Sequence, residues 1–185
     1  MKLQELFEDS QKKLADMKIN GKTVLLKGRV RAEWDGDLSV PSHKGITSLE
    51  GSPKFIKGYF ICGRLNEIKT LKGGPEYVGG SFDCAQLELT SLEHGPKEIN
   101  TRAPSGFGYE CFRNKLTSLK GIPKNLMRLQ AGENLINTLE DFPERIEKDC
   151  NVNNNKLTNL KNIHKHIKYI GGRLEISENP IKSHI

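Results

Sequence analysis

The chain has 185 residues, which is enough for one domain with a hydrophobic core. Hydrophobic residues make up 35% of it and charged residues 28%, so the composition is lean in apolar material without being that of a disordered chain. A formal net charge of +6 invites a nucleic-acid hypothesis, whereas the lack of a long apolar run argues against a membrane span or signal peptide and favours a cytoplasmic protein.

The N-terminal residues have the pattern of a cap. Over residues 2–19 apolar side chains recur at helical spacing, namely Leu3, Leu6, Phe7, Leu14 and Met17. Asn20 and Gly21 then predict a turn, and apolar and charged residues alternate from Val24 to Trp34 as in a strand. We therefore predict an N-terminal cap of amphipathic helix plus strand over residues 1–35, followed by a repeat solenoid over residues 36–185.

A four-residue phrase that begins with leucine or isoleucine and ends with leucine recurs in the second region, usually with a proline after it. Its copies are Ile46-Thr47-Ser48-Leu49, Ile68-Lys69-Thr70-Leu71, Leu89-Thr90-Ser91-Leu92, Leu116-Thr117-Ser118-Leu119, Ile136-Asn137-Thr138-Leu139 and Leu157-Thr158-Asn159-Leu160. Successive copies lie 20 to 22 residues apart, except for one interval of 27 residues. The longer interval predicts an inserted loop near residues 100–106, in which Arg102 is a candidate contact residue.

A short stretch of alternating polarity precedes each phrase, and one more follows the last phrase. The seven stretches cover residues 36–40, 58–62, 80–84, 107–111, 127–131, 148–152 and 172–176. Their third and fifth residues are apolar and their second and fourth mostly polar, which predicts strands with one buried face. An asparagine follows four of these strands, at Asn114, Asn134, Asn155 and Asn179. We expect these asparagines to turn inward and bond backbone groups that the coil leaves unpaired.

This pattern resembles a leucine-rich repeat, and is most similar to the short 20 to 22-residue repeats of bacterial secreted effectors and of bacterial and phage proteins. The resemblance covers about residues 36–181 and implies an α/β-type repeat solenoid with about seven short parallel strands. Effectors of this kind often carry a separate catalytic domain, and no residues remain here to supply one. The opening Met1-Lys2-Leu3-Gln4-Glu5-Leu6-Phe7-Glu8 resembles the start of many tailed-phage proteins, which would place the protein in a host cell's cytoplasm.

Residues with catalytic or metal-binding chemistry form no recognisable site in the sequence. The cysteines lack C-x-x-C spacing and fall on strand positions expected to be buried, which favours a small apolar role: Cys62, Cys84, Cys111 and Cys150. The two histidines within residues 164–166 are a weak metal signal, because no further ligands accompany them. We therefore predict no enzymatic activity, no cofactor and no metal ion.

The outward-facing strand residues are the candidate binding residues, because in this architecture they line the concave face on which solenoids bind partners. Acids outnumber arginines among them, and one exposed apolar spot offers an anchor for a protein. The predicted binding residues are Tyr59, Ile61, Asp83, Glu110, Arg128, Asp149 and Arg173, with Arg102 in the inserted loop. We expect a protein partner with a basic or mixed surface and, by analogy, a phage accessory protein that binds or inhibits a host factor.

Other interpretations stay open. The outward residues could be solvated side chains without a partner. Nucleic-acid binding would use the basic cap residues Lys27, Arg29 and Arg31 with lysines on the outer side, although interspersed glutamates break any continuous positive track. Residues 180–185 are too few to cap the last coil, so this open coil is a candidate surface for a homodimer.

Overall fold

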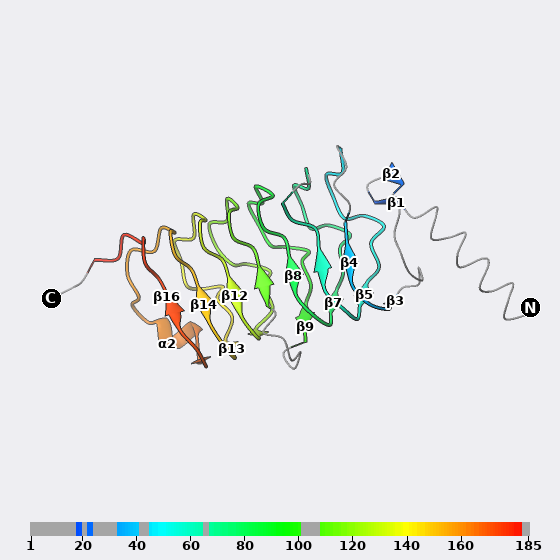
Figure 1. Ribbon diagram of the computed structural model, residues 1–185. Coiled ribbons are helices and arrows are strands. Elements are labelled where there is room, and N and C mark those ends of the chain that lie inside the picture. Colours follow the sequence, from blue (N-terminus) through cyan, green and yellow to red (C-terminus); the bar gives the residue numbers. More distant parts are fainter. Residues whose placement is uncertain are drawn as a thin grey trace, which may run out of the picture.

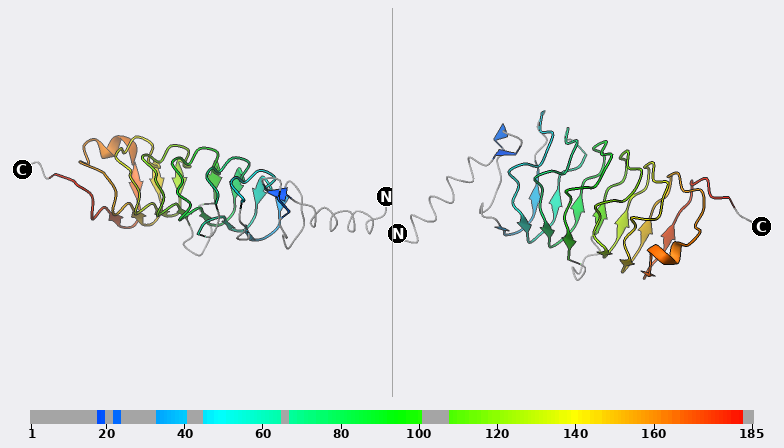
Figure 2. Two further views of the ribbon diagram at one scale, coloured as in Figure 1. Left: turned by 90° about the horizontal axis from the view of Figure 1, so that it is seen from above. Right: turned by 180° about the vertical axis from the view of Figure 1, so that it is seen from behind.

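A computed structural model describes residues 33–40, 45–64, 67–100 and 108–182, together with the backbone of two short strands at residues 18–19 and 22–23. The described residues form a solenoid of parallel strands with about six turns and roughly 22 residues per turn (Figure 1). The views in Figure 2 show strands on two opposite sides of the stacked coils. Because one coil cannot bury its own apolar side chains, the stacking of neighbouring coils creates the core.

One side of the solenoid is a sheet of seven parallel strands. These are β4 (Leu38–Ser39), β6 (Phe60–Ile61), β8 (Phe82–Asp83), β10 (Tyr109–Glu110), β12 (Leu129–Gln130), β14 (Cys150–Asn151) and β16 (Leu174–Glu175). Each strand is the third and fourth residue of a predicted stretch, so the prediction of seven parallel strands is confirmed. The register places equivalent residues side by side, so that the rings of Phe60, Phe82 and Tyr109 follow one another with centroids 5.8 and 5.0 Å apart.

The other side consists of a second series of strands, of which the sequence alone predicted only the first, at the end of the alternating stretch from Val24 to Trp34. A four-stranded sheet contains β3 (Glu33–Trp34), β5 (Phe55–Ile56), β7 (Tyr77–Val78) and β9 (Glu98–Ile99), and a three-stranded sheet contains β11 (Asn125–Leu126), β13 (Arg145–Ile146) and β15 (Tyr169–Ile170). The division between these sheets falls at the 27-residue interval. β3 pairs with β5, so the first coil already includes residues of the predicted N-terminal cap.

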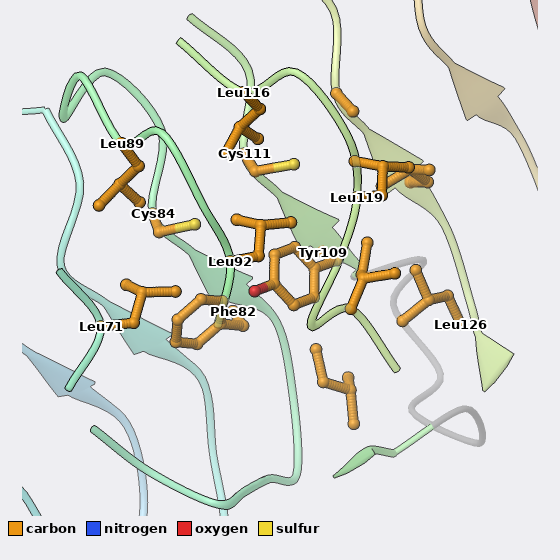
Figure 3. Close-up of a cluster of buried hydrophobic side chains, with 14 of the residues drawn as sticks. Leu71, Phe82, Cys84, Leu89, Leu92, Tyr109, Cys111, Leu116, Leu119 and Leu126 are labelled. Atoms are coloured by element: carbon orange, nitrogen blue, oxygen red, sulfur yellow. The ribbon is translucent and has the colours of Figure 1, made fainter. Parts of the chain in front are cut away.

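The core is a column of apolar side chains between the two sides. Leu71, Leu92 and Leu119, each the last residue of a repeated phrase, are fully buried. Figure 3 shows these leucines around the buried side chains of Phe82 and Tyr109. The four cysteines are buried and free, and burial raises their pKa values, that of the Cys150 thiol to about 12. They fill space as small apolar residues, as their strand positions predict.

The four predicted asparagines form a ladder inside the turns that follow the strands. The Oδ1 atom of Asn134 accepts a hydrogen bond from the N–H of Leu116 at 3.1 Å, and its Nδ2 atom donates to the carbonyl of Cys111 at 3.0 Å. Asn114 also donates to the Cys111 carbonyl, so neighbouring asparagines share an acceptor. Equivalent bonds to Leu89, Ile136 and Leu157 recur at the other three asparagines. The ladder therefore pairs backbone groups that the coils leave without a strand partner.

The polar third residue of the repeated phrase determines the turn after it. In five coils its side-chain oxygen accepts a hydrogen bond from the N–H two residues later, at Thr70, Ser91, Ser118, Thr138 and Asn159. A residue with positive φ often follows, such as Gly121 with φ of 98°. A Cβ atom at Gly121 would lie 2.6 Å from the carbonyl oxygen of Leu92. Both the backbone conformation and the close approach of the neighbouring coil therefore require glycine there.

Helix is scarce in the described part of the chain, so the α/β character expected of the repeat is not observed there. Turns and extended segments join the strands, and α2 (Ile163–His166) is the one helix found in the described ranges. No helix within those ranges has the length and apolar character that a membrane span requires.

The predicted cap helix lies outside the described residues except at its end. There, β1 (Lys18–Ile19) pairs antiparallel with β2 (Lys22–Thr23), so the expectation of helix as far as residue 19 is wrong. An Asn-Gly pair favours a tight hairpin turn, and the residues on either side of it then pair as strands instead of continuing a helix.

Candidate functional site

The outward side chains of the seven-stranded sheet, which we call the sheet face, contain a surface hollow of about 320 Å³ near the N-terminal end. It is lined by Tyr59, Ile61, Arg64, Ser81, Asp83 and Glu110. The strands β6, β8 and β10 place Ile61, Asp83 and Glu110 side by side in register. Four of the predicted binding residues therefore meet at one place on the sheet face.

Asp83 anchors the base of the hollow. Although its strand position points outward, its side chain is only 9% exposed. Its Oδ1 atom accepts a hydrogen bond from the N–H of Ala85 at 2.9 Å, and its Oδ2 atom lies 3.3 Å from an Nη atom of Arg64. The guanidinium of Arg64 covers the carboxylate, which explains the difference from the exposed side chain that alternation predicts. Asp83 thus fixes the backbone that follows β8 and the side chain of Arg64.

Arg64 and Glu110 form the upper part of the hollow. The Arg64 guanidinium lies 3.7 Å from the Glu110 carboxylate and 5.7 Å from the centre of the Phe112 ring. One guanidinium therefore serves two carboxylates, which leaves the hollow with a net negative charge. Burial raises the pKa of Glu110, and the neighbouring Asp83 carboxylate raises it further. The environment of Glu110 consequently favours additional positive charge.

Tyr59 and Ile61 supply the apolar part of the lining. Both are partly exposed on the sheet face. The backbone N–H of Tyr59 donates to Asp37 Oδ1 at 3.0 Å, which fixes the start of β6 against the preceding coil. A hydrogen bond with the Asp37 carboxylate also raises the pKa of the Tyr59 hydroxyl. The hollow thus combines an apolar wall with a negatively charged wall.

Three of the other predicted binding residues lie together further along the sheet face. Arg128 lies 3.4 Å from the Asp149 carboxylate, and the backbone N–H of Arg173 donates to Asp149 Oδ1 at 3.0 Å. That backbone hydrogen bond is the main reason why the pKa of Asp149 is lowered. These residues contact one another and do not line the hollow. Arg102 lies outside the described residues.

The sequence prediction missed Arg64, which joins the two carboxylates of the hollow. Arg64 follows the strand-ending Cys62 by two residues and has a φ of 74°. Arg113 follows Cys111 at the same spacing and pairs with Glu133 at 2.9 Å. An arginine two residues after a strand-ending cysteine could have identified Arg64 as a site residue, because this position lies beside carboxylates of the following coil.

Four of the outer lysines form ion pairs with glutamates of neighbouring coils. The ion pairs are Lys72 with Glu50 at 3.0 Å, Lys120 with Glu93 at 2.9 Å, Lys97 with Glu76 at 2.7 Å and Lys124 with Glu144 at 3.6 Å. These pairs alternate in sign along the turns and give no continuous positive track. The basic cap residues Lys27, Arg29 and Arg31 lie outside the described residues. In the part of the chain that the structure describes, no group of three or more His, Cys, Asp or Glu residues is arranged to hold a metal ion.

Comparisons with protein-family models, with curated proteins and with solved structures each gave no match. Function is therefore inferred from the residues of this chain.

Proposed function

We propose that this protein is a non-enzymatic protein-binding module of the leucine-rich-repeat type that binds its partner through the sheet face. The period, the leucine phrase and the asparagine ladder support the repeat type. Solenoids of this kind present an extended strand surface to partners, since loops and turns are placed at its edges. The start of the sequence extends the proposal to a phage accessory protein that binds a host factor in the cytoplasm.

The hollow on the sheet face is the observation that carries this proposal. It offers an apolar wall of Tyr59 and Ile61 beside two carboxylates that share the guanidinium of Arg64. A lysine or arginine of the partner has the matching form, because its aliphatic stem packs on the apolar wall and its charge bonds Glu110. A partner with a basic or mixed surface therefore fits this part of the sheet face.

Nucleic-acid binding, the alternative, is less well supported. It needs lysines that are free to contact successive phosphates, whereas the outer lysines described above form ion pairs with glutamates of neighbouring coils. The hollow itself would repel a phosphate. These observations favour a protein partner over a nucleic acid.

The test is a charge reversal at Glu110 with a matched control. Immobilised wild-type protein, Glu110→Lys and Glu98→Lys are compared for capture of partners from the native host cell, and captured proteins are then purified and measured by calorimetry. Glu98 is exposed on the opposite side of the solenoid, so its reversal changes net charge equally without touching the hollow. We expect Glu110→Lys to weaken binding about 10- to 100-fold, as for a lost charge-assisted bond, and Glu98→Lys to leave it unchanged.

Three results would contradict the proposal. Equal weakening by both variants would show that net charge, and not the hollow, governs the interaction, and unchanged binding by both would show that the partner does not use Glu110. Stronger binding by both variants, with a ligand released by nuclease, would support nucleic-acid binding, because each reversal adds positive charge. Asp83 is unsuitable for this test because its buried carboxylate also holds the N–H of Ala85.

A further inference from the structure

Among the described residues, the last strand of the seven-stranded sheet, β16, has no partner strand on its outer edge. In the preceding coils, inward-facing residues donate their N–H groups to the next strand: Cys150 to Arg173 at 2.8 Å and Val152 to Glu175 at 2.8 Å. Leu174 of β16 and Ile176 directly after it are the equivalent residues, and within the described ranges no strand follows to accept from them. Such an edge is a template for pairing with another strand.

Apolar side chains accompany this backbone edge. Leu174, Ile176 and Ile170 are only partly buried, whereas their counterparts in the preceding coil, Cys150 and Val152 among them, are buried. Residues 179–182 do not cover the edge, because the N–H of Lys182 bonds the carbonyl of Thr158 on the turn side of the coil. Figure 1 shows β16 at the end of the sheet, with the chain continuing away from it. The end of the solenoid thus combines free donors with accessible apolar surface.

The charges on β16 identify the strand that fits this edge. Arg173 and Glu175 flank Leu174 and lie on the sheet face, with 79% and 35% of their side chains exposed. When two copies of β16 pair antiparallel about Leu174, each Arg173 lies opposite the Glu175 of the other copy. Directly opposite residues of antiparallel strands have Cβ atoms about 5 Å apart, within reach of an ion pair. The strand is therefore complementary to itself, in hydrogen bonding, in apolar surface and in charge.

We propose that a second copy of this chain covers the edge, giving a two-fold dimer through antiparallel β16 strands. The two-fold arrangement repeats every contact, as closed symmetric dimers do. It joins two sheet faces end to end and doubles the number of hollows without using any residue of the hollow. The dimer thus leaves the hollow free for the proposed partner.

Sedimentation equilibrium over a concentration series tests the dimer with two charge reversals. Arg173→Glu places two glutamates opposite two glutamates across the pair, and Glu175→Arg places two arginines opposite two arginines. We expect the wild type to approach twice its monomer mass of 20.8 kDa, and each variant alone to dissociate at least about tenfold more readily. An equimolar mixture of the two variants should dimerise again, because the two glutamates on β16 of one copy then face the two arginines on β16 of the other.

The control is Arg113→Glu, a reversal of the same sign on an inner coil, which should dimerise like the wild type. Circular dichroism checks the fold of every variant. The milder Arg173→Gln and Glu175→Gln, which remove a charge without reversing it, should each weaken the dimer less than the reversal at the same position. A wild type that stays monomeric at all concentrations would overturn the proposal. So would a mixture no more dimeric than the separate variants, or wild-type species that grow beyond a dimer, which would indicate pairing of β16 with another edge such as β4.

Discussion

Replacing Asn155 with alanine tests whether the asparagine ladder holds the coils together. The Asn155 side chain is 1% exposed, its Oδ1 atom accepts from the N–H of Ile136 at 2.9 Å, and its Nδ2 atom donates to the carbonyls of Ala131 and Val152, each at 3.0 Å. Alanine removes all of these bonds. The two carbonyls keep other asparagine donors, from the neighbouring steps of the ladder. The N–H of Ile136 is the group left buried without an acceptor.

The expected loss follows from that single orphaned donor and from the space that the amide vacates. A buried N–H without a partner costs about 1–3 kcal/mol, and the vacated volume adds roughly 1 kcal/mol. Asn155→Ala should therefore lower the free energy of unfolding by about 2–4 kcal/mol. Asn159→Ala is the matched control, because Asn159 is exposed and its side chain bonds only neighbouring residues of the turn, accepting from the N–H of Lys161 and donating to the hydroxyl of Thr158. It should lose less than about 1 kcal/mol.

Urea unfolding followed by circular dichroism measures both variants, and an unchanged m value shows that the same surface is exposed in each. A reduced m value for Asn155→Ala would indicate that the last coils unfold separately, and hydrogen exchange would locate them. Equal losses for the two variants, within about 0.5 kcal/mol, would refute the reasoning. The buried ladder would then contribute no more than an exposed turn.

Three further predictions concern single groups. Tyr109→Phe should leave stability unchanged or raise it by about 1–2 kcal/mol, because the buried Tyr109 hydroxyl has no hydrogen-bond partner in the described structure; a loss of stability in thermal unfolding would contradict this. Burial raises the pKa of Glu110, so the folded state disfavours its ionised form. Glu110→Gln should accordingly unfold at a higher temperature than the wild type near pH 7, and this difference should vanish as the pH falls below the ordinary glutamate value of 4.5. Gly121→Ala should destabilise more than Gly36→Ala in the same assay, since both have positive φ but only the Gly121 position meets a neighbouring backbone.

Much of the fold could be predicted because the repeat makes each strand visible several times. The alternation in the stretch around Phe82 is weak evidence alone, but it recurs with its third residue seven or eight residues before each of the six leucine phrases and once more after the last, which predicted all seven strands of one sheet. The inward asparagines were also predictable, since a coil must satisfy its backbone groups wherever strand pairing stops.

The six strands that follow β3 in the second series were missed because each has only one inward residue. Ile56 and Val78 are the buried members of β5 and β7, and a glycine stands two residues after each, so no second apolar residue reveals an alternation. Their distance from the preceding proline, three residues in both cases, was the usable signal. In the site, Asp83 was predicted to face solvent, and only the three-dimensional proximity of Arg64 explains its burial.

The net charge of +6 describes the whole chain and not the field at the sheet face. Four lysines on the turns are paired with glutamates, while the described part of the sheet face holds five carboxylates against two guanidinium groups, with Arg64 beside them. At physiological salt, charges farther apart than about 8 Å are largely screened, so a partner responds to the hollow and not to distant lysines. A basic chain can therefore attract a basic partner at this face. Rising salt should weaken that binding, measured by calorimetry, because local attraction is screened; binding that strengthens with salt would show that the net charge of the chain dominates instead.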